Sequence, residues 1–576
     1  MFKKFLEKSK NIFSSKQNSV FSAASIIMIM IVASRILGLV RQRVLAHFFD
    51  ANDLSLFFAA FRLPDLLFEV LVWGTFSSAF IPVFTKSLQK GRKNAWKIAG
   101  SVTNISLIIF FILATFIIIF ADKLYGFFVP GFGVADRDRV VLIARILFAA
   151  QGFFVISYVL SAVLESLKRF LVPAIAPLFY NLGIILGTLF FAPKLGLLGP
   201  TIGVLIGAFL HFLVQLPLAY RLGFRFSLKT KITPEVKKIG RLALPRLIEV
   251  SFLQIAKTIE LSLATLISTA SYTYFTFGNT IQLLPVGLFG ISIAKAALPT
   301  LSRQSENIEE FKKTLFNALR QMFFLILPVS TFLIVLRIPI VRLIYGTDIF
   351  SWESTVQTGL VVSAFAFGII FQATSSILAR SFYALHDTKT PVLVSIGTIL
   401  INIIADLLLV KVFHLPIWGL AAAFSFASFL QSSLLYIFLV KKIGDGDSVK
   451  KFLPALKSII SSVISGSVMY LLLKIFDRSV WVKKLSFMGK VQGLENINFE
   501  RFVLDTRYTG NLLVLTIFVL SIGSLVYILS SLLLKSEELK YFLSYLKRIF
   551  YSKKNKTLPE KELEPFSEPP EDTSSI

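Results

Sequence analysis

Residues 19–49 read SVFSAASIIMIMIVASRILGLVRQRVLAHFF, an apolar stretch that contains Arg35 and Arg41. About 20 predominantly apolar residues are enough for a helix to cross a bilayer, so this stretch predicts a transmembrane helix. An arginine at the centre of a lipid-exposed helix costs at least about 2.5 kcal/mol, and such side chains normally face protein, water or a ligand. The two arginines therefore favour an anionic ligand.

Apolar stretches recur along the whole chain of 576 residues, which is 55% hydrophobic with a mean hydropathy of +0.75. The pattern predicts an all-α polytopic membrane protein. The first stretch is too long for a cleavable signal peptide and further spans follow it. We therefore expect it to stay in the mature protein.

The net charge of +27 comes from basic residues in many short connections, not from one basic soluble domain. This distribution argues against nucleic-acid binding and is typical of cytoplasmic loops in membrane proteins. The chain has no cysteine, which excludes disulfides, thiolate metal sites and cysteine nucleophiles. Its four histidines are too scattered to suggest a zinc site.

Hydropathy and charged breaks predict about fourteen spans. They begin near residues 20, 54, 98, 139, 171, 199, 239, 271, 314, 354, 391, 417, 454 and 511. Every second connection is rich in Lys and Arg, which predicts that these connections and both termini face the cytoplasm. The basic segment 477–510 breaks this alternation, and we interpret it as a small folded external insert.

Sequence features recur at an offset of about 220 residues, for example Pro82 with Pro299 and Pro173 with Pro391. Such repeats are typical of transporters, and copies with an even number of spans share their orientation in the membrane. We therefore expect two six-helix lobes around a central cavity, plus two extra C-terminal helices. The predicted parts are a cytoplasmic N-terminus (1–19), an N-lobe (20–223), a C-lobe (224–444), spans thirteen and fourteen (445–550) and a disordered cytoplasmic tail (551–576).

Arg62, Asp65 and Glu69 in the second span lie at i, i+3 and i+7, on one face of a helix. Pro64 predicts a kink at this place. Two interpretations stay open for these charges. They form an ion pair within the helix that helps the span to insert, or Arg62 serves a cavity.

Three later spans also contain polar groups. Lys257 and Glu260 in the seventh span have the i, i+3 spacing of an ion pair. Lys295 in the eighth span either reaches the cavity or extends to the cytoplasmic interface. Asn402 and Asp406 lie one turn apart in the eleventh span, where they offer oxygen ligands to a cation such as Na⁺ or bond a neighbouring helix.

Five segments share a family pattern: SRILGLVR at 34–41, FFAAFRLP at 57–64, GTFSSAFIP at 74–82, LPVGLFG at 284–290 and LPTLS at 298–302. With their order and the fourteen-span layout, they resemble the MurJ/MviN family. This is a family of lipid II flippases in the multidrug/oligosaccharidyl-lipid/polysaccharide exporter superfamily. Only the insert and the tail fall outside the resemblance.

The resemblance implies that Arg35 and Arg41 line a central cavity and engage a lipid-linked diphosphate. This role suits guanidinium groups, which bind phosphate oxygens bidentately. It also implies a sodium site between the seventh and eleventh spans, for which the matching residues are Glu260, Asn402 and Asp406.

The chain departs from the family pattern at four positions. Phe68 stands where an arginine is common, and Trp73 replaces an acid. In the eighth span, Thr280 replaces the cavity arginine and Asn279 stands where an acid is common. We hypothesise that other cations supply the missing charge. The candidates are Arg62, Lys257 and Lys295.

The sequence thus predicts a flippase that moves undecaprenyl-diphosphate-linked peptidoglycan precursor (lipid II) to the outer leaflet of the bacterial cytoplasmic membrane by alternating access. We expect a transporter and no enzyme, with Na⁺ as candidate coupling ion and with the lipid bilayer and other cell-wall synthesis proteins as candidate partners. The alternatives are an exporter of another lipid-linked oligosaccharide or a drug, a polytopic glycosyltransferase, and a transport-inactive scaffold. Arg35 and Arg41 favour an anion over a cationic drug, and the outward loops show no catalytic motif for glycosyl transfer.

Overall fold

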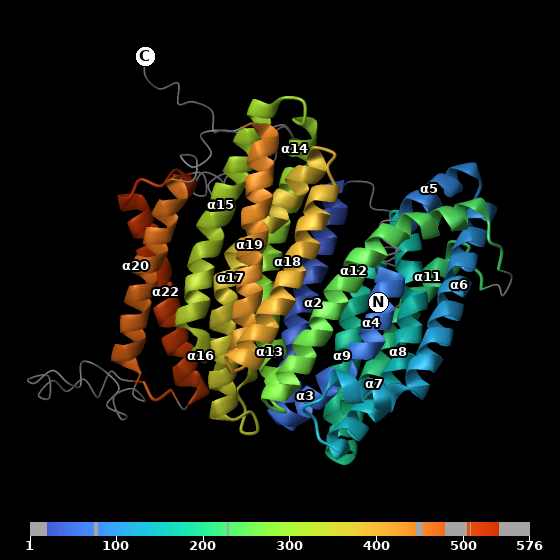
Figure 1. The fold of residues 1–576 in the computed structure, drawn as a ribbon, viewed down its shortest axis with the longest axis horizontal. Helices are drawn as coiled ribbons and strands as arrows, with labels where there is room; N and C mark the ends of the chain where they lie inside the picture. The colour runs from blue at the N-terminus through green and yellow to red at the C-terminus, as the bar shows by residue number, and fades with distance from the viewer. Residues whose placement is uncertain are drawn as a thin grey trace, which may run out of the picture. The chain divides into compact units, whose positions relative to one another are not determined.

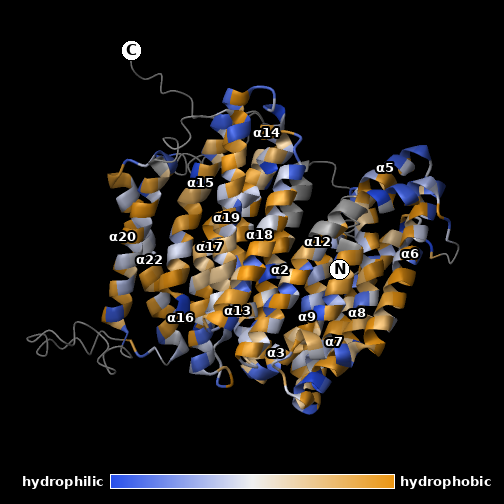
Figure 2. Cartoon of the chain, in the orientation of Figure 1, coloured by the Kyte–Doolittle hydropathy of each residue, from blue (hydrophilic) through white to orange (hydrophobic). Residues whose placement is uncertain are grey.

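The computed structural model describes residues 20–73, 79–226, 230–444, 453–477, 504–506 and 508–540. These residues form helices joined by short connections (Figure 1), and twelve helices among them are long and apolar enough to cross a membrane. Figure 2 shows hydrophobic residues along the helices and hydrophilic residues gathered near their ends. The predicted all-α polytopic class is confirmed. The N-terminus 1–19, most of the insert and the tail 551–576 lie outside the described residues.

The chain up to residue 225 contains ten α-helices and one π-helix within its described residues. They are α2 (Val20–Phe48), α3 (Ala51–Ala60), α4 (Arg62–Phe68), η1 (Glu69–Trp73), α5 (Ile81–Lys90), α6 (Arg92–Ile119), α7 (Ala121–Phe128), α8 (Val134–Ser166), α9 (Leu171–Leu195), α10 (Leu198–Leu213) and α11 (Leu216–Arg221). The later described residues form α12 (Pro234–Ile267), α13 (Ser271–Pro285), η3 (Val286–Ile291), α14 (Ser292–Arg303), α15 (Ile308–Val335), α16 (Arg337–Tyr345), α17 (Trp352–Ala384), α18 (Lys389–Leu407), η4 (Leu408–Val412), α19 (Trp418–Ile443), α20 (Leu453–Phe476) and α22 (Thr509–Leu533).

The helices divide into two compact units. Unit 1 comprises Met1–Thr276 with Ile344–Ser354, and unit 2 comprises Phe277–Leu343 with Thr355–Ile576. Compactness and sequence repeat are different criteria, so these units do not test the predicted lobe boundary at residue 223. The lobes and the two-helix appendage stay predictions.

The second predicted span is broken into α3, α4 and η1. Pro64 has no N–H and cannot bond the carbonyl of Ala60, which would be its partner in a continuous helix. Instead, the Tyr125 hydroxyl donates to the Ala60 oxygen at 2.7 Å. The helix therefore stops at Ala60 and begins again at Arg62, which places the charged residues of α4 on a separate short helix.

The internal repeat recurs in the order and length of the helices. Both α6 and α15 have 28 residues, and both α8 and α17 have 33. Left-handed residues match as well: Lys168 (φ 58°) with His386 (φ 57°), and Gly196 (φ 55°) with His414 (φ 51°). We call α2 to α11 copy one and α12 to α19 copy two.

A seam of glycines joins α9 to α10 in unit 1. A Cβ atom on Gly187 would lie 2.3 Å from the Cα of Gly203, and one on Gly183 would lie 2.4 Å from the Cα of Gly207. Only glycine permits such an approach, which small residues at fourfold spacing commonly provide in membranes. Helix α9 also packs against α2, where the Asn181 amide donates to the Ser34 carbonyl at 3.4 Å. The seam thus supports the helix that carries Arg35 and Arg41.

Candidate functional site

Arg35 and Arg41 both lie on α2 but differ in exposure. Arg35 is exposed, whereas Arg41 is half-buried and its Nε atom is buried without a hydrogen-bond partner among the described residues. Tyr180 of α9 and Tyr345 interact electrostatically with the Arg41 guanidinium. A buried donor without an acceptor costs free energy unless a ligand or water satisfies it. The described residues therefore supply no acceptor for Arg41 Nε, which leaves this donor available to an anionic ligand.

The end of α2 that follows Arg41 is held by the last residues of α16 and by the segment that follows them. The Tyr345 hydroxyl donates to the Gln42 side chain at 2.8 Å, and the Arg43 guanidinium donates to the Ile344 carbonyl at 3.1 Å. The Thr347 hydroxyl donates to the Ala46 carbonyl at 2.6 Å. These bonds restrain the backbone on the C-terminal side of Arg41.

Arg62 is buried, with 6% of its surface exposed, and two of its guanidinium nitrogens donate hydrogen bonds to α12. Its Nε donates to the Thr258 hydroxyl at 3.0 Å, and one terminal nitrogen donates to the Gln254 carbonyl at 3.1 Å. The same nitrogen also donates to the Gln254 side-chain oxygen. The structure thus places Arg62 between two helices, as a group that binds α4 to α12.

Lys257 forms an ion pair with Glu69, whose Oε2 lies 3.3 Å from its Nζ. The predicted spacing suggested Glu260 instead, on the same helix as Lys257. A spacing of i, i+3 permits a pair but does not select it, and here η1 brings a carboxylate to α12 from another helix. The Gln254 amide donates to the same Glu69 oxygen.

Asp65 completes this group of charges in unit 1. Its Oδ1 accepts a hydrogen bond from Gln151 of α8 at 2.7 Å. We call Arg62, Asp65, Glu69, Gln254 and Lys257 the charge network. It contains two cations and two carboxylates, so its net charge is zero when all four groups are ionised. Arg62 and Lys257, predicted to bind cargo, already have protein partners.

The position of the absent family arginine is filled by an aromatic cluster. Phe68 is buried, and its ring centroid lies 5.2 Å from that of Tyr158 and 5.9 Å from that of Phe154. Trp73 belongs to η1, and its side chain lies outside the described residues. This part of unit 1 is thus apolar at a position where the family resemblance implied an arginine.

In unit 2, the neighbourhood of Thr280 on α13 is a chain of amides. The Gln282 amide donates to the Asn279 side chain at 2.9 Å, and the Gln372 amide of α17 donates to Gln282 at 2.8 Å. Lys295 lies on an exposed position of α14 in the same unit. The other four cations predicted to bind cargo belong to unit 1.

The predicted sodium ligands divide between the two units. Glu260 is half-buried on α12 in unit 1, whereas Asn402 and Asp406 are buried on α18 in unit 2. The Asn402 amide donates to an Asp406 carboxylate oxygen at 3.1 Å. Carboxylate and amide oxygens suit a hard cation, so the donor chemistry of this pair fits Na⁺. No cluster of three or more His, Cys, Asp or Glu side chains that could hold a metal occurs in the part of the chain that is described.

Sequence reasoning missed the polar residues that link the charges. Gln254, Thr258 and Gln151 are buried and bind Arg62 or Asp65. A usable signal existed, since an amide inside an apolar span is costly unless it is hydrogen-bonded. Its partner, however, depends on which helix packs against it.

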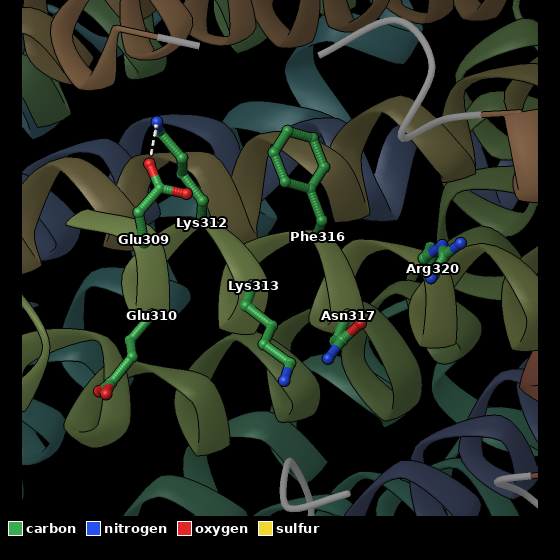
Figure 3. A pocket seen from close by; sticks show the side chains of 7 residues that line it. All are labelled: Glu309, Glu310, Lys312, Lys313, Phe316, Asn317 and Arg320. Carbon is green, nitrogen blue, oxygen red and sulfur yellow. Dashed lines mark hydrogen bonds and ion pairs between the residues drawn. The ribbon is translucent and has the colours of Figure 1, made fainter. Parts of the chain in front are cut away.

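A pocket of about 480 Å³ lies along the first turns of α15 in unit 2 (Figure 3). Figure 3 shows Glu309 and Lys312 pointing toward each other, and their charged atoms lie 2.7 Å apart. Arg320 at the far end contacts Glu537 at 3.5 Å and Glu538 at 3.6 Å. Because acids accompany these cations, the pocket does not favour an anionic ligand.

Comparison with known proteins identifies the family. The family model for lipid II flippase MurJ matches residues 44–491. A probable lipid II flippase MurJ from Haemophilus influenzae is 30% identical over 435 residues, which cover 72% of this chain and 84% of the relative. One from Thermotoga maritima is 27% identical over 519 residues, or 88% of this chain and 96% of the relative.

Solved structures agree with these relatives. The structure of a lipid II flippase MurJ in an inward closed conformation matches with a TM-score of 0.71 and 25% identity, covering 88% of this chain and 97% of that one. An inward-facing multidrug resistance MATE family transporter of the MOP superfamily shares the fold, with a TM-score of 0.60 at 15% identity over 71% of this chain and 94% of its own. The chain is a multi-pass membrane protein that belongs to the lipid II flippase MurJ family.

Proposed function

We propose that this chain translocates lipid II from the inner to the outer leaflet of the cytoplasmic membrane by alternating access. The observation that carries the proposal is Arg41, a half-buried guanidinium whose buried Nε has no acceptor among the described residues. A diphosphate supplies several acceptor oxygens and negative charge in one group. The relatives that bear the name lipid II flippase support this cargo over a cationic drug.

In this mechanism Arg41 and Arg35 bind the diphosphate while the lipid tail remains in the bilayer. The cargo biases the carrier only if its affinity differs between the inward-open and outward-open states. No covalent bond is made or broken. The alternation of Lys and Arg between connections supports an orientation with both termini in the cytoplasm.

We propose Na⁺ as the coupling ion. Asn402 and Asp406 would hold it through their oxygen atoms, and its positive charge would couple transport to the ion gradient. Na⁺ should raise the midpoint of thermal unfolding of the purified chain relative to K⁺ at equal concentration, and Asp406→Asn should remove the difference. Persistence of the full Na⁺ effect in Asp406→Asn contradicts this site.

Complementation tests the proposed cargo. A bacterial strain depleted of its own lipid II flippase receives wild type, Arg35→Ala, Arg41→Ala or the control Arg145→Ala, at matched membrane levels. Arg145 forms an exposed ion pair with Asp122 at 3.2 Å, remote from the arginines of α2 in sequence and helix. We expect rescue by wild type and Arg145→Ala only.

Two results would overturn the proposal. Rescue by both Arg35→Ala and Arg41→Ala would show that neither arginine is needed to transport the cargo. Failure of wild type to rescue, although it is present in the membrane, points to another lipid-linked cargo.

A further inference from the structure

One carboxylate oxygen of Glu69 contacts Lys257 directly and is linked to Arg62 through the Gln254 side chain. Lys257 Nζ lies 3.3 Å from this oxygen, and the Gln254 amide donates to it. The other end of the Gln254 side chain accepts from Arg62. Glu69 therefore neutralises Lys257 directly and Arg62 through one intervening amide.

The ion pair of Glu69 with Lys257 is weak enough for an anionic ligand to replace Glu69 as the partner of Lys257. The side chains of Lys257 and Glu69 are 39% and 22% exposed, whereas Arg62 is 6% exposed. A partly exposed pair between single charges contributes about 1 kcal/mol or less. A diphosphate carries more charge and more acceptor oxygens than one carboxylate, so it competes well for the same ammonium group.

The backbone at Glu69 also differs from a regular helix. Glu69 is the first residue of η1, which continues α4 with π-helical bonding. π-Helical turns are rare, and they occur frequently at functional sites. Asp65 lacks these features, because it lies within α4 and is bound by Gln151 of α8 at 2.7 Å.

An unpaired cation inside a span is costly in the membrane, so a protein carboxylate that pairs with Lys257 lowers the free energy of the empty carrier. We infer that Glu69 is an internal counterion: it pairs with Lys257 in the empty carrier and yields this cation to the diphosphate of the cargo. This inference rests on the proposed function, since it assumes a diphosphate cargo. Glu69 is thus a positioning residue that competes with the cargo for Lys257. It pairs with Lys257 again when the cargo leaves.

Binding of inorganic pyrophosphate to the purified full chain tests the inference. Calorimetry would compare wild type with Glu69→Gln, Glu69→Asp and Lys257→Met, each first shown to unfold in a cooperative thermal transition. Loss of the competing charge should lower the Kd in Glu69→Gln by about fivefold, the equivalent of one exposed ion pair. Glu69→Asp keeps the charge and should stay within about twofold of wild type, whereas Lys257→Met should raise the Kd by about fivefold or more.

A merely structural role for Glu69 gives a different pattern. Glu69→Gln then lowers thermal stability while its Kd stays equal to that of wild type or rises, and this result overturns the inference. If wild type itself binds no pyrophosphate, the diphosphate site of the proposed function fails instead. If wild type rescues the depleted strain but the Kd of Glu69→Gln is unchanged, the counterion role of Glu69 is refuted. The proposed flippase function then still holds.

If Glu69→Gln does not fold, the charge swap replaces it. Glu69→Lys combined with Lys257→Glu keeps one pair beside Gln254, and Lys257→Glu alone does not. The inference expects pyrophosphate binding in the double variant and its loss in the single one. Equal Kd values in the two swap variants contradict it.

Discussion

In each repeat copy, a polar contact binds the second span to the 33-residue helix of that copy, which is α8 in copy one and α17 in copy two. The two contacts differ in charge. In copy one, Gln151 of α8 donates to the Asp65 carboxylate of α4 at 2.7 Å. In copy two, at an offset of about 220 residues, Gln372 of α17 donates to the Gln282 amide of α13 at 2.8 Å. The contact is kept although its charge is not.

This difference teaches that holding the helices together does not require charge. A neutral amide performs the task in copy two, where Asn279 stands at the position that matches Arg62. The charges of copy one therefore need another explanation, and anion binding supplies one. Copy two instead has the buried pair of Asn402 and Asp406, which suits a cation.

The largest effect is expected at the seam of α9 and α10, which copy one builds from glycines. Gly203→Val should lower the free energy of unfolding by about 3 kcal/mol or more, because its side chain would clash with the Gly183 carbonyl and the Gly187 backbone. Thermal unfolding of the purified chain measures the loss. The control is Gly397→Ala in copy two, where no atom lies within 4 Å of the added Cβ and alanine should be neutral or stabilising. Equal midpoints for the two variants would refute the glycine seam.

Charging the neutral contact of copy two should have the next largest effect. Gln282 is fully buried, so Gln282→Glu introduces a carboxylate without a cation and should cost about 3 kcal/mol. Adding Asn279→Arg, which recreates the i, i+3 arrangement of copy one, should recover part of this loss. The thermal unfolding midpoints of the single and double variants measure this loss and its recovery. If Gln282→Glu is as stable as wild type, charge is tolerated equally in both copies.

A smaller effect is expected where the copies share a left-handed residue. Gly196 (φ 55°) in copy one corresponds to His414 (φ 51°) in copy two. Gly196→Ala should destabilise by about 1 kcal/mol, and His414→Gly should stabilise by up to about 1 kcal/mol, because glycine adopts this conformation without strain. Changes of the same sign in the two unfolding midpoints would contradict the matched conformation.

The smallest effect concerns the loop between α17 and α18. Lys442 donates to Asp387 at 2.7 Å, and together with bonds from Thr390 it lowers the pKa of Asp387 to about 2. Because the folded pKa lies below the unfolded one, the stabilisation is complete above about pH 4 and is lost as the pH falls toward 2. Copy one has arginines, Arg169 and Arg221, at the matching positions.

Asp387→Asn should therefore lower stability by about 1 kcal/mol near neutral pH, since Lys442 is partly exposed and the pair is screened. The difference from wild type should disappear near pH 2. A difference that is independent of pH would show that the loop depends on the shape of Asp387 and not on its charge. Unfolding midpoints at pH 7 and pH 2 measure the difference.

Much of the fold could be predicted because each span must be apolar and about 20 residues long. Predicted starts at 171 and 271 coincide with the starts of α9 and α13. The start predicted near 98 is late, because α6 begins at Arg92 with a charged turn that hydropathy does not detect. Short helices such as α5 and α7 were not predicted, since they are too short to give a membrane signal.

The candidate site was only partly predictable. Arg41 was singled out as a candidate because an arginine inside an apolar span is costly wherever the helix packs, and its role as a cargo ligand stays a prediction. The partner of Lys257 was predicted wrongly in favour of Glu260, and Gln254 was not predicted at all. The roles of Arg35, Lys295 and the sodium ligands stay predictions.

The sequence by itself determined the membrane-spanning helices, the repeat and the family. The spans follow from the apolar length that a bilayer requires. The repeat and the family follow from motifs whose residues are consecutive in the sequence. Only the tertiary structure decided which charges are engaged. Arg62 binds Gln254 and Thr258, and Lys257 binds Glu69, because Pro64 interrupts the second span and η1 meets α12. Such partners come from helices about 190 residues apart in the chain, which no local spacing specifies.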